Sequence, residues 1–167
     1  MQNDIDIIIY GATGFTGQLC VKYFKSLDAS VKWAIAGRDK KKLQKVAKDH
    51  SVEVEILIAD SDNEAELDIL TSRAKVILST TGPFHKYGSK LVASCVKNRS
   101  HYVDITGENF WVKGIIAQHH EEASAKGIRI IPSCGYDSIP SDLGVFYAAK
   151  ALNKPIKRVE SFHSWKG

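Results

Sequence analysis

Three glycines near the start of the chain have the spacing of a loop that holds a phosphate group. They follow a short apolar run and open a helical pattern. In such loops one glycine allows a tight turn, one lets backbone N–H groups approach a pyrophosphate, and one lets the helix pack on the strand. The N-terminus of the helix then faces the phosphate charge. We therefore expect one continuous segment to bind a dinucleotide: Gly11, Ala12, Thr13, Gly14, Phe15, Thr16 and Gly17.

The second apolar run ends in Gly37 and Arg38, where NAD enzymes usually carry an acidic residue for the ribose 2′-hydroxyl. The planar guanidinium of an arginine suits a phosphate instead. Arg38 therefore favours NADP(H), with NAD(H) as the alternative cofactor and a solvated arginine as the alternative interpretation. Asp39 follows as a candidate N-cap of the next helix.

Two later loops carry polar groups that can complete a cofactor site. Asp60 and Ser61 follow the third apolar run and suit either an adenine contact or a helix N-cap. Thr80, Thr81 and Gly82 follow the fourth run, beside the point where a ligand crevice opens in sheets of this kind. Their hydroxyls suit the second ribose and phosphate, and a plain turn is the alternative.

The loops after the fifth and sixth runs hold groups capable of acid–base chemistry, among them Asp104, Glu108, Tyr136 and Asp137. Capping and turn formation explain these residues equally well, so we assign no catalytic residue from the sequence. The adjacent pair His119-His120 diverges by about 100° on a helix, so the two rings do not converge on one ion. We expect no metal site.

Short strand signals and amphipathic helical signals alternate along the chain. The strand signals are rich in Ile and Val, as in strands buried on both faces of a parallel sheet. They cover Ile5–Tyr10, Val31–Ala36, Val54–Ile58, Lys75–Ser79, His101–Ile105 and Arg129–Pro132. The right-handed crossover rule then predicts an α/β fold, a Rossmann-type doubly wound parallel sheet of six strands in the order 3-2-1-4-5-6.

The periodicity also predicts which helix faces are buried and where the first domain ends. On the first helix the apolar face comprises Leu19, Cys20, Tyr23, Phe24 and Leu27. A fifth helix should end at Gly127, and a sixth should begin near Ser141 or Asp142. Val159–His163 has the pattern of one more strand. We therefore expect a cofactor-binding domain at residues 1–154 and, at residues 155–167, the start of an α+β substrate domain.

Composition limits the classes of protein that remain. The chain has 167 residues, 44% of them hydrophobic and 25% charged, with a net charge of +4. That charge is too small to indicate nucleic acid binding without a basic motif. No apolar run reaches the length of a membrane span, and the N-terminus lacks a signal-peptide pattern. Three widely spaced cysteines favour a reducing, cytoplasmic location.

Five segments together resemble the saccharopine dehydrogenase-like oxidoreductases, which include trans-acting enoyl reductases. They are Tyr10–Gly17, Ala36–Arg38, Thr81–Phe84 with Tyr87-Gly88, Tyr102–Asp104 with Gly107-Glu108, and Pro132–Asp142. The resemblance implies an N-terminal NAD(P)-binding domain and a C-terminal α+β domain. Relatives of the true saccharopine reductases carry a Cys-Gly-x-x-Pro-Gly-like motif, from which Ser138-Ile139-Pro140-Ser141 departs.

The leading functional prediction is the cofactor-binding part of an NADP(H)-dependent oxidoreductase. The enzyme would move a hydride to or from a carbonyl, imine or enoyl group of a small molecule, and it would form any homo-oligomer through the second domain. The alternative is a non-catalytic NAD(P) sensor of the NmrA-like type, since such regulators also begin with a glycine-rich loop. Because these residues supply one wall of a substrate cleft, we expect them to bind cofactor without completing a turnover.

Overall fold

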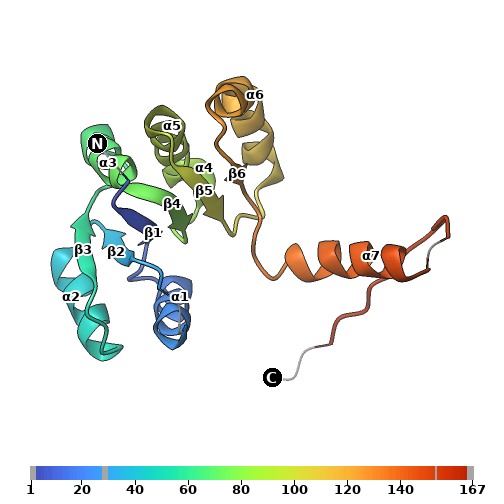
Figure 1. The fold of residues 1–167 in the computed structure, drawn as a ribbon, viewed down its shortest axis with the longest axis horizontal. Helices are drawn as coiled ribbons and strands as arrows, with labels where there is room; N and C mark the ends of the chain where they lie inside the picture. Colours follow the sequence, from blue (N-terminus) through green and yellow to red (C-terminus); the bar gives the residue numbers. More distant parts are fainter. Residues whose placement is uncertain (1–2, 28–29, 153, 165–167) are drawn as a thin grey trace.

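The computed structural model describes residues 3–27, 30–152 and 154–164, in which strands and helices alternate (Figure 1). The strands are β1 (Ile5–Tyr10), β2 (Trp33–Gly37), β3 (Glu55–Ile58), β4 (Ala74–Ser79), β5 (His101–Asp104) and β6 (Ile130–Ile131). The helices are α1 (Phe15–Ser26), α2 (Lys40–Asp49), α3 (Glu64–Arg73), α4 (Phe84–Tyr87), α5 (Ser89–Asn98), α6 (Asn109–Lys126) and α7 (Ile139–Leu152).

The six strands form one parallel sheet in the order β3-β2-β1-β4-β5-β6. This confirms the predicted fold and strand order. β1 lies at the centre, where Ile9 pairs with Ile35 of β2 on one side and Leu78 of β4 on the other. Figure 1 shows α1 and α2 on one face of the sheet and α3, α5 and α6 on the opposite face. The carboxyl ends of all six strands therefore meet at one edge.

Apart from Asp6 near its start, the central strand is apolar, because it is covered on both faces. Ile8 and Ile9 are both fully buried, yet they belong to different clusters. Ile8 packs with residues such as Leu91 of α5, whereas Ile9 packs with Val21 of α1. Alternation along β1 thus supplies one side chain to each half of the core.

Helix ends follow the capping residues that the sequence offers. The Asp39 carboxylate accepts the Lys42 N–H at 3.0 Å, which confirms Asp39 as the N-cap of α2. Gly127 ends α6 with a φ of 68°, in the left-handed region that favours glycine, as predicted. These caps fix where α2 and α6 join the sheet.

The predicted buried face of α1 is only partly right. Cys20 and Phe24 do pack against the core, but Leu19 and Tyr23 are 50% and 62% exposed. The fully buried positions of this helix are Gly17 and Val21. The close approach of Gly17 to β1 orients α1, and the apolar residues on the other side of the helix are left at the surface.

The last part of the chain differs from its prediction. α7 begins at Ile139, two residues before Ser141, and none of its residues is buried. Figure 1 shows α7 extending away from the sheet. Val159–His163 is not a strand, so that prediction is wrong. A strand needs a neighbour to take its backbone hydrogen bonds, and no strand within the described ranges pairs with this segment. No helix in those ranges is long and apolar enough to cross a membrane.

Candidate cofactor-binding site

A cavity of about 420 Å³ lies at the carboxyl edge of the sheet, where the loops after β1, β2, β3 and β4 come together. This is the place where doubly wound sheets bind their ligands. Its lining comprises Tyr10, Gly11, Thr13, Gly14, Gly37, Arg38, Ser61, Thr80, Thr81, Gly82, Pro83 and Tyr87. Eight of the thirteen residues predicted from the sequence are in this set.

The glycine loop leaves no room for side chains where it turns. Gly11 has a φ of +87°, and a Cβ there would lie 2.3 Å from the Thr81 hydroxyl oxygen. A Cβ on Gly17 would lie 2.2 Å from the Gly11 carbonyl oxygen. By contrast, a Cβ on Gly14 would meet only that same oxygen at 3.4 Å, with the cavity beside it. Gly11 and Gly17 therefore shape the loop, whereas Gly14 keeps the cavity open.

The N-terminus of α1 suits an anion. Its N-cap is Gly14, which provides no side-chain cap, and its first turn contains no acidic residue. The first backbone N–H groups of a helix lack intrahelical partners and carry partial positive charge. Three predicted residues of this segment do not line the cavity: Ala12 is buried, Phe15 is 82% exposed and Thr16 is half-buried. Gly17 likewise acts through the packing of α1 on β1.

The opposite end of the cavity is formed by Gly37, Arg38 and Ser61, at the ends of β2 and β3. Arg38 is exposed and makes no ion pair within residues 3–27, 30–152 and 154–164, so its guanidinium is available to a phosphate. Asp60 is not part of the lining. Its carboxylate accepts the Asp62 N–H at 2.9 Å, so it is engaged in a local turn. The alternative of a helix N-cap is wrong for Asp60, because the N-cap of α3 is Asn63.

The loop after β4 supplies a hydroxyl that lacks a partner. Thr80 donates to the carbonyl oxygens of Tyr10 and Gly11, at 3.3 and 3.2 Å. The hydroxyl oxygen of Thr81 is buried against Gly11 and has no hydrogen-bond partner among the described residues. An unpaired buried hydroxyl is unfavourable unless a ligand completes it. Together with the open helix N-terminus, this fits a phosphorylated dinucleotide.

Besides Gly37, which the sequence placed next to Arg38, three lining residues were missed from the sequence. Tyr10 ends β1, and its hydroxyl donates to the Ala59 carbonyl oxygen at 3.2 Å, while burial raises the pKa of the phenol. Pro83 follows a cis peptide bond, and Tyr87 lies on the four-residue helix α4. A helix this short has no periodicity, so the signal that could have located Tyr87 was its place in the family-like segment.

The loops after β5 and β6 are joined by a buried carboxylate. Asp104 accepts the Thr106 and Ser133 N–H groups, each at 3.0 Å, and the Tyr102 hydroxyl at 2.8 Å. Burial raises the pKa of Asp104. Ser133 has a φ of 63°, a conformation that this contact helps to hold. Asp104 therefore fixes these two loops, in agreement with the turn-forming alternative.

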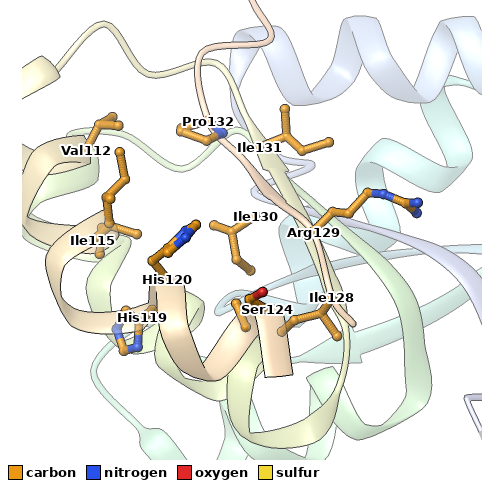
Figure 2. A pocket seen from close by; sticks show the side chains of 12 residues that line it. Val112, Ile115, His119, His120, Ser124, Ile128, Arg129, Ile130, Ile131 and Pro132 are labelled. Carbon is orange, nitrogen blue, oxygen red and sulfur yellow. The ribbon is translucent and has the colours of Figure 1, made fainter. Parts of the chain in front are cut away.

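A second cavity, of about 390 Å³, lies between α6 and β6 (Figure 2). Apolar side chains dominate it, and Ile130 points into it toward α6 while Arg129 points away. It contains neither glycine loop nor helix N-terminus, so it does not suit a dinucleotide. His119 and His120 both line it, but no group of three or more potential metal ligands occurs in the described part of the chain.

Known proteins are similar in sequence to this chain over most of its length. A saccharopine dehydrogenase-like oxidoreductase of Mus musculus is 37% identical, covering 96% of the chain and 41% of the relative. A trans-acting enoyl reductase of Mycobacterium leprae is 37% identical, covering 87% and 35%. A lipid droplet localized protein of Caenorhabditis elegans is 35% identical, covering 94% and 39%. The chain thus spans about two fifths of the length of the curated relatives it matches.

A solved structure and a family model complete the comparison. Apo saccharopine dehydrogenase (L-Glu forming) from Saccharomyces cerevisiae shares the fold, with a TM-score of 0.70 at 19% identity over 89% of this chain and 31% of that one. The model of the saccharopine dehydrogenase NADP binding domain matches residues 7–131. Its description names NADP, which confirms the cofactor predicted from Arg38. The chain belongs to the saccharopine dehydrogenase NADP binding domain family.

Proposed function

We propose that this chain binds NADP(H) and is the cofactor-binding part of an oxidoreductase. The observation that carries the proposal is the cavity at the carboxyl edge, which is lined by glycines and an arginine and has an uncapped helix N-terminus beside it. The cofactor would supply the hydride chemistry, which acts on a carbonyl, imine or enoyl group. The names of the relatives, an oxidoreductase and an enoyl reductase, support this reaction class.

Each part of the cavity has a distinct task in this proposal. The loop from Gly11 to Gly17, with the first turn of α1, holds the pyrophosphate. Arg38 pairs with the 2′-phosphate, and Ser61 lies beside it at the adenosine end. Thr80, Thr81 and Gly82 contact the second ribose and phosphate, where the Thr81 hydroxyl gains the partner it lacks. Of the predicted contacts, that of Asp60 has the least support, since its carboxylate is already engaged.

We extend the proposal to organisation and location. Residues 1–154 form the cofactor-binding domain, and residues 155–167 begin a substrate-handling domain. The greater length of the relatives and the exposed apolar side chains of α7 support such a second domain. The substrate is a small molecule, nucleic acid is not a partner, and any homo-oligomer forms through the second domain. The compartment we propose is the cytoplasm.

Calorimetric titration with NADPH and NADH tests the cofactor assignment. The parent chain should prefer NADPH by about 10- to 100-fold, the value of one charge-assisted contact. Arg38→Ala should remove most of that preference and leave NADH affinity nearly unchanged. Gly14→Val should abolish binding of both cofactors, because the new side chain enters the cavity and not the core.

The control for both variants is the free energy of unfolding, which should stay within about 1 kcal/mol of the parent value. Equal affinity of the parent for NADPH and NADH would refute the role of Arg38. Unchanged NADPH affinity in a folded Gly14→Val variant would place the cofactor elsewhere.

A further inference from the structure

Glu108 lies at the start of α6, but its carboxylate reaches the neighbouring helix α4. One oxygen accepts the Phe84 N–H at 2.8 Å. The other accepts the His85 N–H at 2.8 Å and lies 2.5 Å from the His85 ring nitrogen Nδ1. Burial raises the pKa of Glu108, but these bonds from the backbone and the ring outweigh it and hold the pKa below its usual value. The group is therefore an ionised carboxylate at neutral pH, bound to the first turn of α4.

The helix that Glu108 holds forms one wall of the candidate cofactor site. Pro83, directly before α4, and Tyr87, its last residue, both line the cavity. With four residues, α4 has few internal hydrogen bonds, such as that from the Tyr87 N–H to the Pro83 carbonyl oxygen at 3.1 Å, so contacts with neighbouring elements matter for its position. A further contact comes from Trp111 of α6, whose ring packs on Phe84 at a centroid distance of 5.9 Å. Glu108 and Trp111 thus fix the wall from the same helix.

Glu108 is itself held in place. Its backbone N–H donates to the Thr106 hydroxyl at 3.0 Å, and the Thr106 N–H donates to the buried carboxylate of Asp104. The side chain of Glu108 is only 22% exposed. The contacts run in sequence from the sheet, through Asp104 and Thr106, to Glu108 and then to α4. A rigid acceptor of this kind can set the position of a short helix.

We infer that Glu108 is a positioning residue for the β4 end of the cofactor cavity. It does not line the cavity. It holds Pro83 and Tyr87 where the nicotinamide half of the cofactor passes them. This rests on the proposed NADP(H) function and adds to it a residue outside the cavity.

The two ends of the cavity make the inference testable. Gly37, Arg38 and Ser61 lie beyond β1 on the β2–β3 side, and Pro83 and Tyr87 lie on the β4 side. Adenosine 2′,5′-bisphosphate contains only the adenosine half of NADP⁺, which Gly37, Arg38 and Ser61 would bind. A defect in the β4 wall should therefore weaken NADP⁺ binding and spare this fragment.

The experiment compares both ligands on Glu108→Gln by calorimetry. One amide oxygen cannot accept two backbone N–H groups at these positions, so α4 loosens. NADP⁺ affinity should fall about tenfold, the effect of one charged hydrogen bond, with adenosine 2′,5′-bisphosphate affinity unchanged. The matched control is Glu122→Gln, which removes an exposed carboxylate of the same helix, paired with Lys126. It should alter neither affinity.

A second variant covers the case in which Glu108→Gln disturbs folding. Tyr87→Ala removes the wall residue directly and should weaken NADP⁺ selectively in the same way. The double variant should lose less than the product of the two single effects, since both act through one wall. Independent, multiplicative effects would overturn the inference, as would equal weakening of both ligands or unchanged NADP⁺ affinity in Glu108→Gln. A parent chain that binds neither ligand would instead refute the proposed function itself.

Discussion

Replacing Gly17 by alanine should destabilise the protein, although alanine is the better helix former. Gly17 lies inside α1, where alanine would normally gain about 1 kcal/mol over glycine. The added Cβ, however, would lie 2.2 Å from the Gly11 carbonyl oxygen and 2.7 Å from the Ala12 Cα. These are backbone atoms of the loop that follows β1, so no side-chain rotation relieves the overlap. Ordinary contact begins near 3.4 Å, so α1 must move from β1 by about 1 Å.

Overpacking of this kind costs about 1–3 kcal/mol, and here it occurs between two segments that cannot yield separately. Because the overlap is with backbone atoms, we expect a cost at the upper end of this range. After the gain of about 1 kcal/mol in helix propensity, the net loss is about 2 kcal/mol in the free energy of unfolding, or about 4–8 °C in the melting temperature for a chain of this size. Urea denaturation and calorimetry measure both. The control is Gly114→Ala on α6, where a Cβ meets nothing within 4 Å and which should be stabilising by about 0.5–1 kcal/mol. Equal behaviour of the two variants would refute the argument that Gly17 sets the distance between α1 and β1.

Four further outcomes can be measured. Asp104→Asn should stay within about 1 kcal/mol of the parent, because the amide oxygen can still accept both backbone N–H groups, whereas Asp104→Ala should lose about 3–5 kcal/mol in urea titrations. Burial raises the pKa of Asp104 above 3.8, so the folded protein favours the protonated carboxyl. This contribution to stability is present at low pH and is lost as the pH rises through the raised pKa. Above that raised pKa the parent should therefore be less stable relative to Asp104→Asn than it is at low pH. Hydrogen bonds from Arg73 lower the pKa of Glu55 and bring the pKa of Asp4 to about 2. The stability that these two ionised carboxylates contribute is therefore present at neutral pH and is lost in acid. The denaturation midpoints of the parent and of Arg73→Met should converge as the pH falls toward 2. Finally, NADPH absorbance should stay constant when the 167 residues are mixed with imine, ketone or enoyl compounds, and turnover would contradict the need for a second wall.

The fold could be predicted because its signals are local. Most strands of the sheet are short runs rich in apolar residues, and parallel crossovers have one preferred handedness. The caps at Asp39 and Gly127 are single residues with known preferences. The glycine loop and Arg38 could be located for the same reason, since their chemistry depends on position relative to a strand end. The cavity that contains them then follows from the topology.

The features of the candidate site that could not be predicted from the sequence depend on contacts between segments far apart along the chain. Phe84 and Glu108 are 24 residues apart, and nothing in either segment indicates that a carboxylate from one holds the helix of the other. The Asp104 carboxylate accepts the N–H groups of both Thr106 and Ser133, and Ser133 is 29 residues from Asp104 in the sequence. Such residues appear in the sequence as acidic groups near a site, and acid–base chemistry is the natural first hypothesis. The structure shows their oxygens already engaged with backbone N–H groups, so their contribution is to the shape of the loops.

The apolar face of α1 illustrates how one contact can outweigh periodicity. Leu19 and Tyr23 are spaced as a buried pair would be, and hydrophobic patterning alone places them in the core. Gly17 packs directly on the backbone of Gly11 and Ala12, just after β1, where any larger side chain would force the two segments apart. Once Gly17 faces the sheet, Val21 and Phe24 must follow it, one and two turns later, and Leu19 and Tyr23 must face outward. The orientation of α1 therefore follows from the close packing of Gly17 on the backbone of Gly11 and Ala12, and the exposure of Leu19 and Tyr23 is a consequence of that packing.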